Sequence, residues 1–398
     1  MDPVEAVPGS GKAGGAGRFD MGRMKFAKVV CGIGLLLVLA INIWNISHWN
    51  EGRGVYDDIC YLRQAHLFKK FGLGGLDTDI RKDGDHYLAD KLKAIGFPAN
   101  DATRIPCHPW KAETNKHVMQ YPPGTGFMLA LFPEGFQVIP LYVLANVTIF
   151  VFALLALYEA REPISLTMAA VFGFAAIYLM INPTKASYSV APTMMVCALA
   201  GYLTAKLFTE PPRHRFGLVA ALGLLIGVSV NFRLPNLFLA AGYCLYLAGA
   251  FLLARNRDTF LRGAIFGVAL VIGMSPTLSA NAINAGSPFA TTYGPDGALA
   301  LRLDMTVLGQ YLRDVQFVLL AIAVAWTIWL WQANQRSARQ VALLVATNLA
   351  ANLIFFTSYP IFTPYYVFPI DMLLLWTLLF ATLNLRGRVA RTPVAGKN

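Results

Sequence analysis

Residues 137–158 read QVIPLYVLANVTIFVFALLALY, and this stretch decides the fold. Its 22 residues include no Asp, Glu, Lys or Arg. About 20 apolar residues in a helix cross the hydrocarbon core of a bilayer, which is about 30 Å thick. In lipid the backbone must satisfy its own hydrogen bonds, and a continuous apolar run does so as a helix. The stretch therefore predicts a transmembrane helix.

Runs of the same kind recur along the chain. Of its 398 residues, 56% are hydrophobic and 14% are charged, whereas about a quarter of a soluble domain is charged. We therefore expect an all-α, polytopic membrane helical bundle of about ten transmembrane helices. The expected spans are 29–47, 137–158, 164–181, 190–208, 216–232, 236–254, 262–280, 315–332, 340–357 and 363–384. A shorter segment, 125–133, is too brief to cross and is expected to lie at the interface as a half-helix.

The basic residues predict the orientation. They cluster at the N-terminus and in short loops on one side of the expected spans, and cytoplasmic loops are rich in Lys and Arg. Both ends of the chain are then inside: a disordered basic segment over 1–28, the membrane domain over 29–384 and a tail over 385–398. Because this clustering accounts for the net charge of +11, nucleic acid is not an expected partner. The opposite short loops hold four cations: Lys185, Arg233, Arg302 and Arg313.

Two long segments are expected on the extracytoplasmic side, 48–124 and 281–314, and the first should carry juxtamembrane helices. Cys60 and Cys107 both lie in the first of these loops, and cysteines outside the cytoplasm can form a disulfide. Spacing alone does not fix connectivity, so free thiols remain the alternative.

The first loop begins with a segment that predicts a short amphipathic helix. Residues 54–68 read GVYDDICYLRQAHLF, with Asp57 and Asp58 at the helix start and Tyr61 on the same face as Asp57. The two acids can be an ordinary helix cap and first-turn charge. They can also supply a general base, since adjacent carboxylates raise the pKa of one of them and the long loop could close over them. The apolar face comprises Ile59, Leu62, Ala65 and Phe68.

The end of the first loop carries a proline and glycine motif. Residues 120–126 read QYPPGTG. The two prolines predict an extended approach to the next apolar segment, and Gly124 and Gly126 allow the backbone to come close to a neighbour. A simple turn into a helix is the other interpretation.

Charged residues next to the apolar runs are candidate ligands for an anion. Arg233 interrupts two runs, and an arginine at such a place can hold a phosphate with two hydrogen bonds. It can also simply extend to the lipid headgroups. Asp371 falls inside the last expected span, where an unpaired charge is unfavourable, and we expect it to pair with one of the arginines.

No metal site is indicated. Asp77 and Asp79, and then Asp83 and Asp85 with His86, form acidic clusters, but basic residues lie among them and a solvated loop surface explains them. The remaining loop histidines have no cysteine or histidine at zinc spacing.

In layout, residues 25–385 resemble the glycosyltransferase C superfamily, and in particular its branch of protein O-mannosyltransferases and lipid A aminoarabinose transferases. Asp57-Asp58-x-x-Tyr61 is similar to the Asp-Glu-x-x-Tyr motif of that branch's first loop. Tyr121-Pro122-Pro123 resembles its Pro-Pro segment, and residues 284–293, from Asn284 through Gly286-Ser-Pro288 to Tyr293, resemble a recurrent bacterial loop.

The resemblance implies roles for residues of this chain. The first-loop acid of the family is the catalytic base or orients the acceptor, so Asp57, together with Asp58, takes the catalytic role. The family often has Arg-Tyr-x-x-Pro near its last core span, whereas residues 365–369 read YYVFP and lack the arginine. Another cation would then hold the phosphate. The residues implied in substrate binding are Tyr61, Tyr121, Lys185, Arg233, Arg302 and Tyr365.

We therefore expect a glycosyltransferase that moves a sugar from a polyprenyl-phosphate donor to a hydroxyl of a glycan, lipid or protein. The implied location is the bacterial inner (plasma) membrane, with the active face extracytoplasmic and membrane lipid as a further partner. No redox cofactor is implied, and a divalent metal is needed by some members of the superfamily only. The alternatives are a lipid or glycan transporter and a non-catalytic envelope scaffold.

Overall fold

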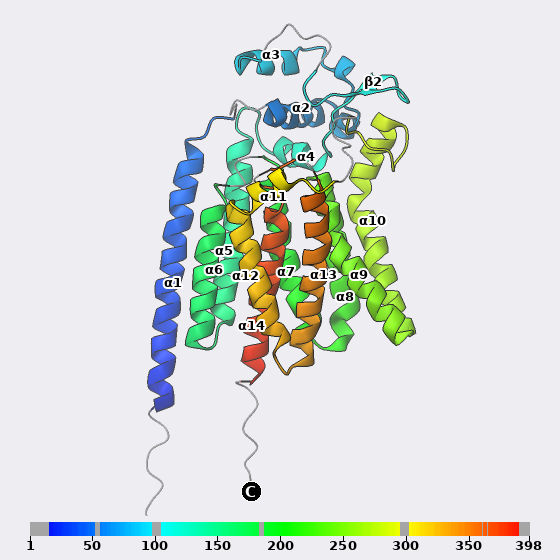
Figure 1. The fold of residues 1–398 in the computed structure, drawn as a ribbon. Helices are drawn as coiled ribbons and strands as arrows, with labels where there is room; N and C mark the ends of the chain where they lie inside the picture. Colours follow the sequence, from blue (N-terminus) through cyan, green and yellow to red (C-terminus); the bar gives the residue numbers. More distant parts are fainter. Residues whose placement is uncertain are drawn as a thin grey trace, which may run out of the picture.

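The chain folds as a helical bundle with a cap of short elements at one end (Figure 1). It is described here from a computed structural model, which covers residues 16–51, 56–97, 105–182, 187–294, 302–359, 361–363 and 365–389. The bundle helices are α1 (Ala16–Ser47), α5 (Val138–Glu159), α6 (Pro163–Leu179), α7 (Val190–Thr209), α8 (Arg215–Val230), α9 (Leu237–Ala254), α10 (Arg257–Ala285), α12 (Val315–Trp331), α13 (Arg336–Ser358) and α14 (Phe368–Val389).

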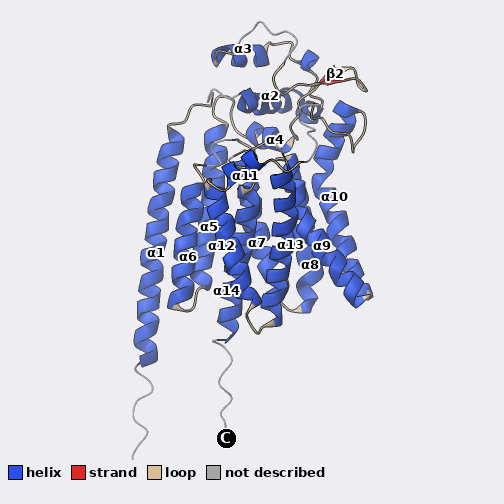
Figure 2. Ribbon diagram, in the orientation of Figure 1, coloured by secondary structure: helices blue, strands red, loops and turns tan. Residues whose placement is uncertain are grey.

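The cap is formed by the two long loops. The first loop contributes α2 (Tyr56–Phe71), η1 (Gly72–Leu76), η2 (Ile80–Lys82), α3 (Tyr87–Ala94), β1 (Trp110–Lys111), β2 (Lys116–His117) and α4 (Gly124–Ala130). The second contributes α11 (Met305–Tyr311). In Figure 2 helix dominates, and the two short strands form an antiparallel pair in which Trp110 faces His117.

Each expected span falls on a bundle helix, and the structure is that of an all-α polytopic protein. Seven helices are long and apolar enough to cross a membrane, within the residues that the structure describes. An eighth is reached if α11 and α12, bent by 77°, are taken together, and α6 and α8 are shorter apolar helices. Length and composition therefore support fewer spans than the ten expected.

The chain ends differ from the expectation. Helix α1 begins at Ala16, so the segment expected to be disordered, 1–28, is already helical in its second part. Its first fifteen residues lie outside the described ranges. Helix α14 continues to Val389, into the expected tail 385–398. The turns of α1 that precede the apolar run carry basic residues, which hydropathy alone does not assign to a span.

The burial of each helix indicates its place in the bundle. Helix α14 is the central one, because 94% of its most apolar window is buried, compared with 17% for α1. Trp376 and Phe380, one turn apart on α14, are fully buried and stack on each other. On α1, by contrast, Leu36 and Leu37 are more than half exposed. An exposed apolar surface of this kind is what a lipid-facing helix presents.

Helices α8 and α10 approach each other through glycines. A Cβ atom on Gly227 of α8 would lie 2.3 Å from the carbonyl oxygen of Leu270. One on Gly273 of α10 would lie 2.4 Å from the carbonyl oxygen of Leu224. Small residues at helix interfaces in membranes allow such close backbone contact, and packing then holds the helices together.

The side chain of Asn231, just past the end of α8, bonds into α10 next to Pro276. Its Oδ1 accepts from the Thr277 N–H at 2.9 Å, and its Nδ2 donates to the Gly273 carbonyl at 2.8 Å. An uninterrupted helix would pair these two backbone groups with each other. A proline inside a helix disturbs this pairing, and a side chain from a neighbouring helix can satisfy the groups. Asn231 therefore anchors the turn between α8 and α9.

The two long loops are joined to each other by hydrogen bonds. The structure pairs Cys60 and Cys107 in a disulfide within the first loop. Asn284, at the end of α10, accepts from Thr78 N–H at 2.9 Å and donates to the Leu76 carbonyl at 2.7 Å. Thr292 donates to the Gln120 carbonyl at 2.9 Å. The 284–293 segment thus holds the first loop against the bundle.

Replacing Gly273 by alanine should destabilise the protein. The new Cβ meets backbone atoms of α8, and overpacking of this kind typically costs about 1–3 kcal/mol. Gly267→Ala, in the same helix, is the matched control because no atom lies within 4 Å of its Cβ position. The midpoint of thermal unfolding in detergent should fall for Gly273→Ala and stay or rise for Gly267→Ala. Equal midpoints would contradict glycine-dependent packing of α8 on α10.

Candidate active site at the α2 end of the bundle

Asp57 and Asp58 lie in the first turn of α2, and neither points into open solvent. Asp57 is half-buried and accepts a hydrogen bond from the hydroxyl of Tyr121. Asp58 is 1% exposed. Burial raises the pKa of the Asp57 carboxyl, and the hydrogen bond from Tyr121 partly opposes this. The cause is burial, whereas the sequence suggested repulsion between the two acids. A raised pKa suits a carboxylate that accepts a proton.

A tyrosine stack covers this acid. The rings of Tyr61 and Tyr121 lie 4.8 Å apart and nearly parallel, and Tyr293 meets Tyr121 edge-on at 6.2 Å. The Tyr61 hydroxyl forms a hydrogen bond with Ser189, just before α7. Residues from the first loop, the second loop and the bundle thus meet around Asp57.

Arg233 is buried at the turn between α8 and α9, with 5% of its surface exposed. Its Nη1 donates to the Tyr365 carbonyl at 3.2 Å. Its guanidinium lies 4.9 Å from the centre of the Tyr365 ring and 5.4 Å from that of Tyr366. Aromatic faces stabilise a cation at such distances. The structure therefore holds Arg233 inside the protein rather than extending it to headgroups.

Asp57 and Arg233 act on the same three tyrosines. Each of the two interacts electrostatically with the hydroxyls of Tyr61, Tyr293 and Tyr365. The acid and the cation come from segments far apart in the sequence, α2 and the end of α8. Both therefore lie within electrostatic range of one group of aromatic hydroxyls, and we name this cluster the Asp57–Arg233 site.

The proline and glycine motif positions both halves of this site. The Gly124 N–H donates to the Asn231 carbonyl at 2.7 Å, and Thr125 donates to the Phe232 carbonyl at 3.2 Å. A Cβ atom on Gly126 would lie 2.5 Å from the side chain of Gln64 on α2. The close approach expected at these glycines is present: α4 contacts the Arg233 turn with one side and α2 with the other. The expected half-helix 125–133 is thus α4, packed inside the cap.

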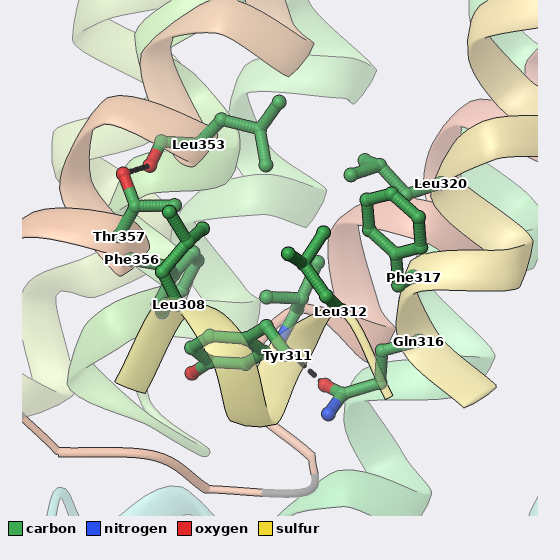
Figure 3. A pocket seen from close by; sticks show the side chains of 10 residues that line it. Leu308, Tyr311, Leu312, Gln316, Phe317, Leu320, Leu353, Phe356 and Thr357 are labelled. Carbon is green, nitrogen blue, oxygen red and sulfur yellow. Dashed lines mark hydrogen bonds between the residues drawn. The ribbon is translucent and has the colours of Figure 1, made fainter. Parts of the chain in front are cut away.

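An apolar cavity of about 200 Å³ lies beside the site, between α11, α12 and α13. Figure 3 shows leucine and phenylalanine side chains, among them Leu312, Leu353 and Phe356, turned toward one another around it. Phe356 packs against Tyr366 at 5.8 Å, and Tyr366 contacts Arg233. The cavity and the buried arginine are therefore separated by a single aromatic side chain.

One expected ligand, Arg302, does not join this cluster. Arg302 is exposed, its backbone N–H bonds to the Ser358 carbonyl, and its side chain interacts with Asp304. Its expected role in substrate binding finds no support in this position. Lys185 lies outside the described residues.

The expected pairing of Asp371 is not found. The residue is fully buried in α14, and neither of its carboxylate oxygens has a hydrogen-bond partner among the described residues. The expectation assumed that a buried acid and a buried cation must meet, but Arg233 is satisfied by tyrosine rings and a carbonyl instead.

The acidic clusters of the first loop are paired with bases. Asp77 forms an ion pair with Lys116 at 3.1 Å. Asp79 pairs with Arg81 and Asp85 pairs with Lys70, both at less than 3 Å. No group of three or more His, Cys, Asp or Glu side chains that could hold a metal occurs within the described ranges.

Sequence reasoning missed an internal support of the loop. Arg63 of α2 is fully buried and donates to the Thr78 and Asp79 carbonyls, both at 3.1 Å, and to His108 Nε2 at 3.0 Å. The Nδ1 of His108 donates to the Pro106 carbonyl at 2.7 Å. The available signal was that Arg63 follows two apolar residues of the buried helix face.

Comparison with models of known families finds no match to this chain, and comparison with curated protein sequences finds none.

The protein should lose stability in acid through His108. Burial, and secondarily the charge of Arg63, lowers the pKa of His108 to about 3. Its ordinary value is about 6.5, so between these values only the unfolded chain binds the proton. The free energy of unfolding should thus be constant above pH 6.5 and fall by about 1.4 kcal/mol per unit below it.

Thermal unfolding between pH 7.5 and 4.5 measures this loss. His108→Gln should reduce the pH dependence, while His48→Gln, which changes an exposed histidine, should retain it. An unchanged slope in His108→Gln would show that other groups cause the acid sensitivity.

Proposed function

We propose that this protein is a membrane glycosyltransferase that moves a sugar from a polyprenyl-phosphate donor to an acceptor hydroxyl. The observation that carries the proposal is the Asp57–Arg233 site. In it a half-buried carboxylate and a buried guanidinium interact electrostatically with the same tyrosine hydroxyls. A base for the acceptor and a cation for the leaving phosphate are the two charges that such a transfer needs.

In the proposed reaction Asp57 takes the proton of the acceptor hydroxyl. The hydroxyl oxygen attacks the anomeric carbon and forms the new glycosidic bond with inversion. The bond between the anomeric carbon and the phosphate oxygen breaks, and polyprenyl phosphate leaves with the electron pair. Arg233 stabilises the negative charge that grows on this phosphate. Asp58, next to Asp57 and buried, is the second acid of the pair.

The tyrosines hold the two charged side chains in place and do not themselves supply charge. Tyr121 donates to Asp57 and so orients the carboxylate, and Tyr61 is held between this ring and Ser189. Tyr365 supports Arg233 through its ring and its carbonyl. Holding the reacting groups in place before the reaction lowers the entropic part of the barrier.

The apolar cavity between α11, α12 and α13 suits the prenyl chain of the donor. It is lined almost entirely by aliphatic and aromatic side chains, and one aromatic residue, Tyr366, separates it from Arg233. A donor whose chain enters between these helices would bring its phosphate to the guanidinium.

We further propose ten spans, a bacterial inner-membrane location and an extracytoplasmic Asp57–Arg233 site. The basic residues at and between the helix ends opposite α2, such as Arg255, Arg257, Arg336 and Arg339, support this orientation. The disulfide between Cys60 and Cys107 supports it independently, because disulfides persist in oxidising compartments.

Asp57→Asn should abolish transfer while leaving the protein folded. Removing a general base typically lowers the rate by about 10²–10⁴-fold. The measurement is transfer of labelled sugar from polyprenyl phosphate by purified protein, with the unfolding midpoint as a control for folding. Asp90→Asn, at an exposed acid of α3, should retain full activity. A fully active Asp57→Asn would remove Asp57 from the role of base. Flux of the lipid-linked sugar across vesicles without product would favour a transporter instead.

Arg233→Gln and Arg302→Gln should separate the buried cation from the exposed one. Loss of a group that stabilises developing charge costs about 10²–10³-fold in kcat. We expect this loss in Arg233→Gln and no loss in Arg302→Gln, whose side chain is exposed. The same transfer assay measures both, and equal effects would argue against phosphate binding at Arg233.

A further inference from the structure

A group of arginines lies at the helix ends opposite α2, the end of the bundle away from the cap in Figure 1. Helices α8, α10 and α13 begin at this end, and α7 and α9 finish there. A cavity of about 610 Å³ opens between these helix ends, three times the size of the cavity beside Arg233. It shares no lining residue with the Asp57–Arg233 site.

Three arginines converge on this cavity. Arg215, Arg262 and Arg336 line it, each from the beginning of a different helix. All three interact electrostatically with the hydroxyl of Tyr246, which also lines the cavity. The three arginines therefore line one cavity and lie within electrostatic range of the same hydroxyl.

Their positive charge is only partly compensated within the described residues. Arg262 forms an ion pair with Asp258, the one acid that lines the cavity. Arg215 and Arg262 repel each other, and the Nε atoms of both are buried with no hydrogen-bond partner in the described part of the chain. The N-termini of α8, α10 and α13 add partial positive charge. Like charges held near one another are unfavourable unless an anion lies between them.

The rest of the cavity wall is apolar and reaches the outside of the bundle. Leu253 lines the cavity and is 91% exposed, and Leu245 and Leu343 line it and are about half exposed. On a membrane protein such side chains face hydrocarbon. The cavity thus offers donors for an anion at one side and an apolar wall continuous with the lipid-facing surface at the other.

We propose that this cavity binds the phosphate headgroup of an anionic membrane lipid. The guanidinium groups of Arg215, Arg262 and Arg336 hold the phosphate oxygens through charge-assisted hydrogen bonds. The hydrocarbon chains lie along Leu245, Leu253 and Leu343. The site is separate from the proposed transfer reaction and does not depend on it.

The test measures lipid binding by the full chain in detergent micelles. The probes are dioleoyl phosphatidic acid, dioleoyl phosphatidylcholine and inorganic phosphate, and native mass spectrometry reports their affinities. We expect phosphatidic acid to bind at least about tenfold more tightly than phosphatidylcholine. The double variant, Arg215→Gln with Arg336→Gln, should bind phosphatidic acid at least about tenfold more weakly than the unmodified chain. The single Arg336→Gln, at an exposed position, should show part of this loss if the double variant does not fold.

The matched control is Arg257→Gln, which changes an exposed arginine at the start of α10 that does not line the cavity. It should bind phosphatidic acid as the unmodified chain does. Unchanged binding in Arg336→Gln, or an equal loss in Arg257→Gln, would overturn the site, the latter because it indicates a diffuse surface charge. Inorganic phosphate that binds as tightly as phosphatidic acid would overturn the assignment to a lipid.

Discussion

The amide of Asn231 is the constraint on which the rest of the structure depends. It accepts from the Thr277 N–H and donates to the Gly273 carbonyl of α10, next to Pro276, and so ties the end of α8 to the middle of α10. In hydrocarbon an unsatisfied backbone group costs several kcal/mol, so this turn has little freedom to move. The carbonyl of the same residue accepts from the N–H of Gly124, the first residue of α4. Gly126, in the same helix, packs against Gln64 of α2. The contacts of Asn231 with α10 and with Gly124 therefore set the position of Asp57 relative to Arg233.

The distribution of polar groups along the bundle is uneven. In the middle of the bundle the helices pack closely against one another. Gly273 of α10 contacts α8, and Trp376 of α14 contacts Gly201 of α7. Ionisable side chains gather at the two ends instead. At the α2 end an acid and a cation share a set of tyrosines, and at the opposite end arginines surround a cavity with a single acid. Asp371, in the first turn of α14, is buried without a hydrogen-bond partner in the described residues.

Local patterns in the sequence were informative wherever the deciding interaction is local. The apolar runs coincide with helices, residues 56–68 lie in α2 with the expected apolar face buried, and Gly124 and Gly126 touch their neighbours closely. Residues whose partners are distant were less predictable. Arg233 and Arg302 look alike as cations at helix ends, yet only the first is enclosed by aromatic rings. For the loop acids the sequence already favoured a solvated loop surface over a metal site, and the structure adds which lysine or arginine each acid pairs with.

The sequence by itself determined that this is an all-α membrane protein with a long loop over one end. The reason is that hydropathy and helix length act over about 20 consecutive residues, without reference to the rest of the chain. Only the tertiary structure decided which charges meet. Asp57 and Arg233 are far apart in the sequence, and they come within electrostatic range of the same tyrosines because α4 packs between α2 and the Asn231 turn. Packing and hydrogen bonds between distant segments set this arrangement, and no local pattern records them.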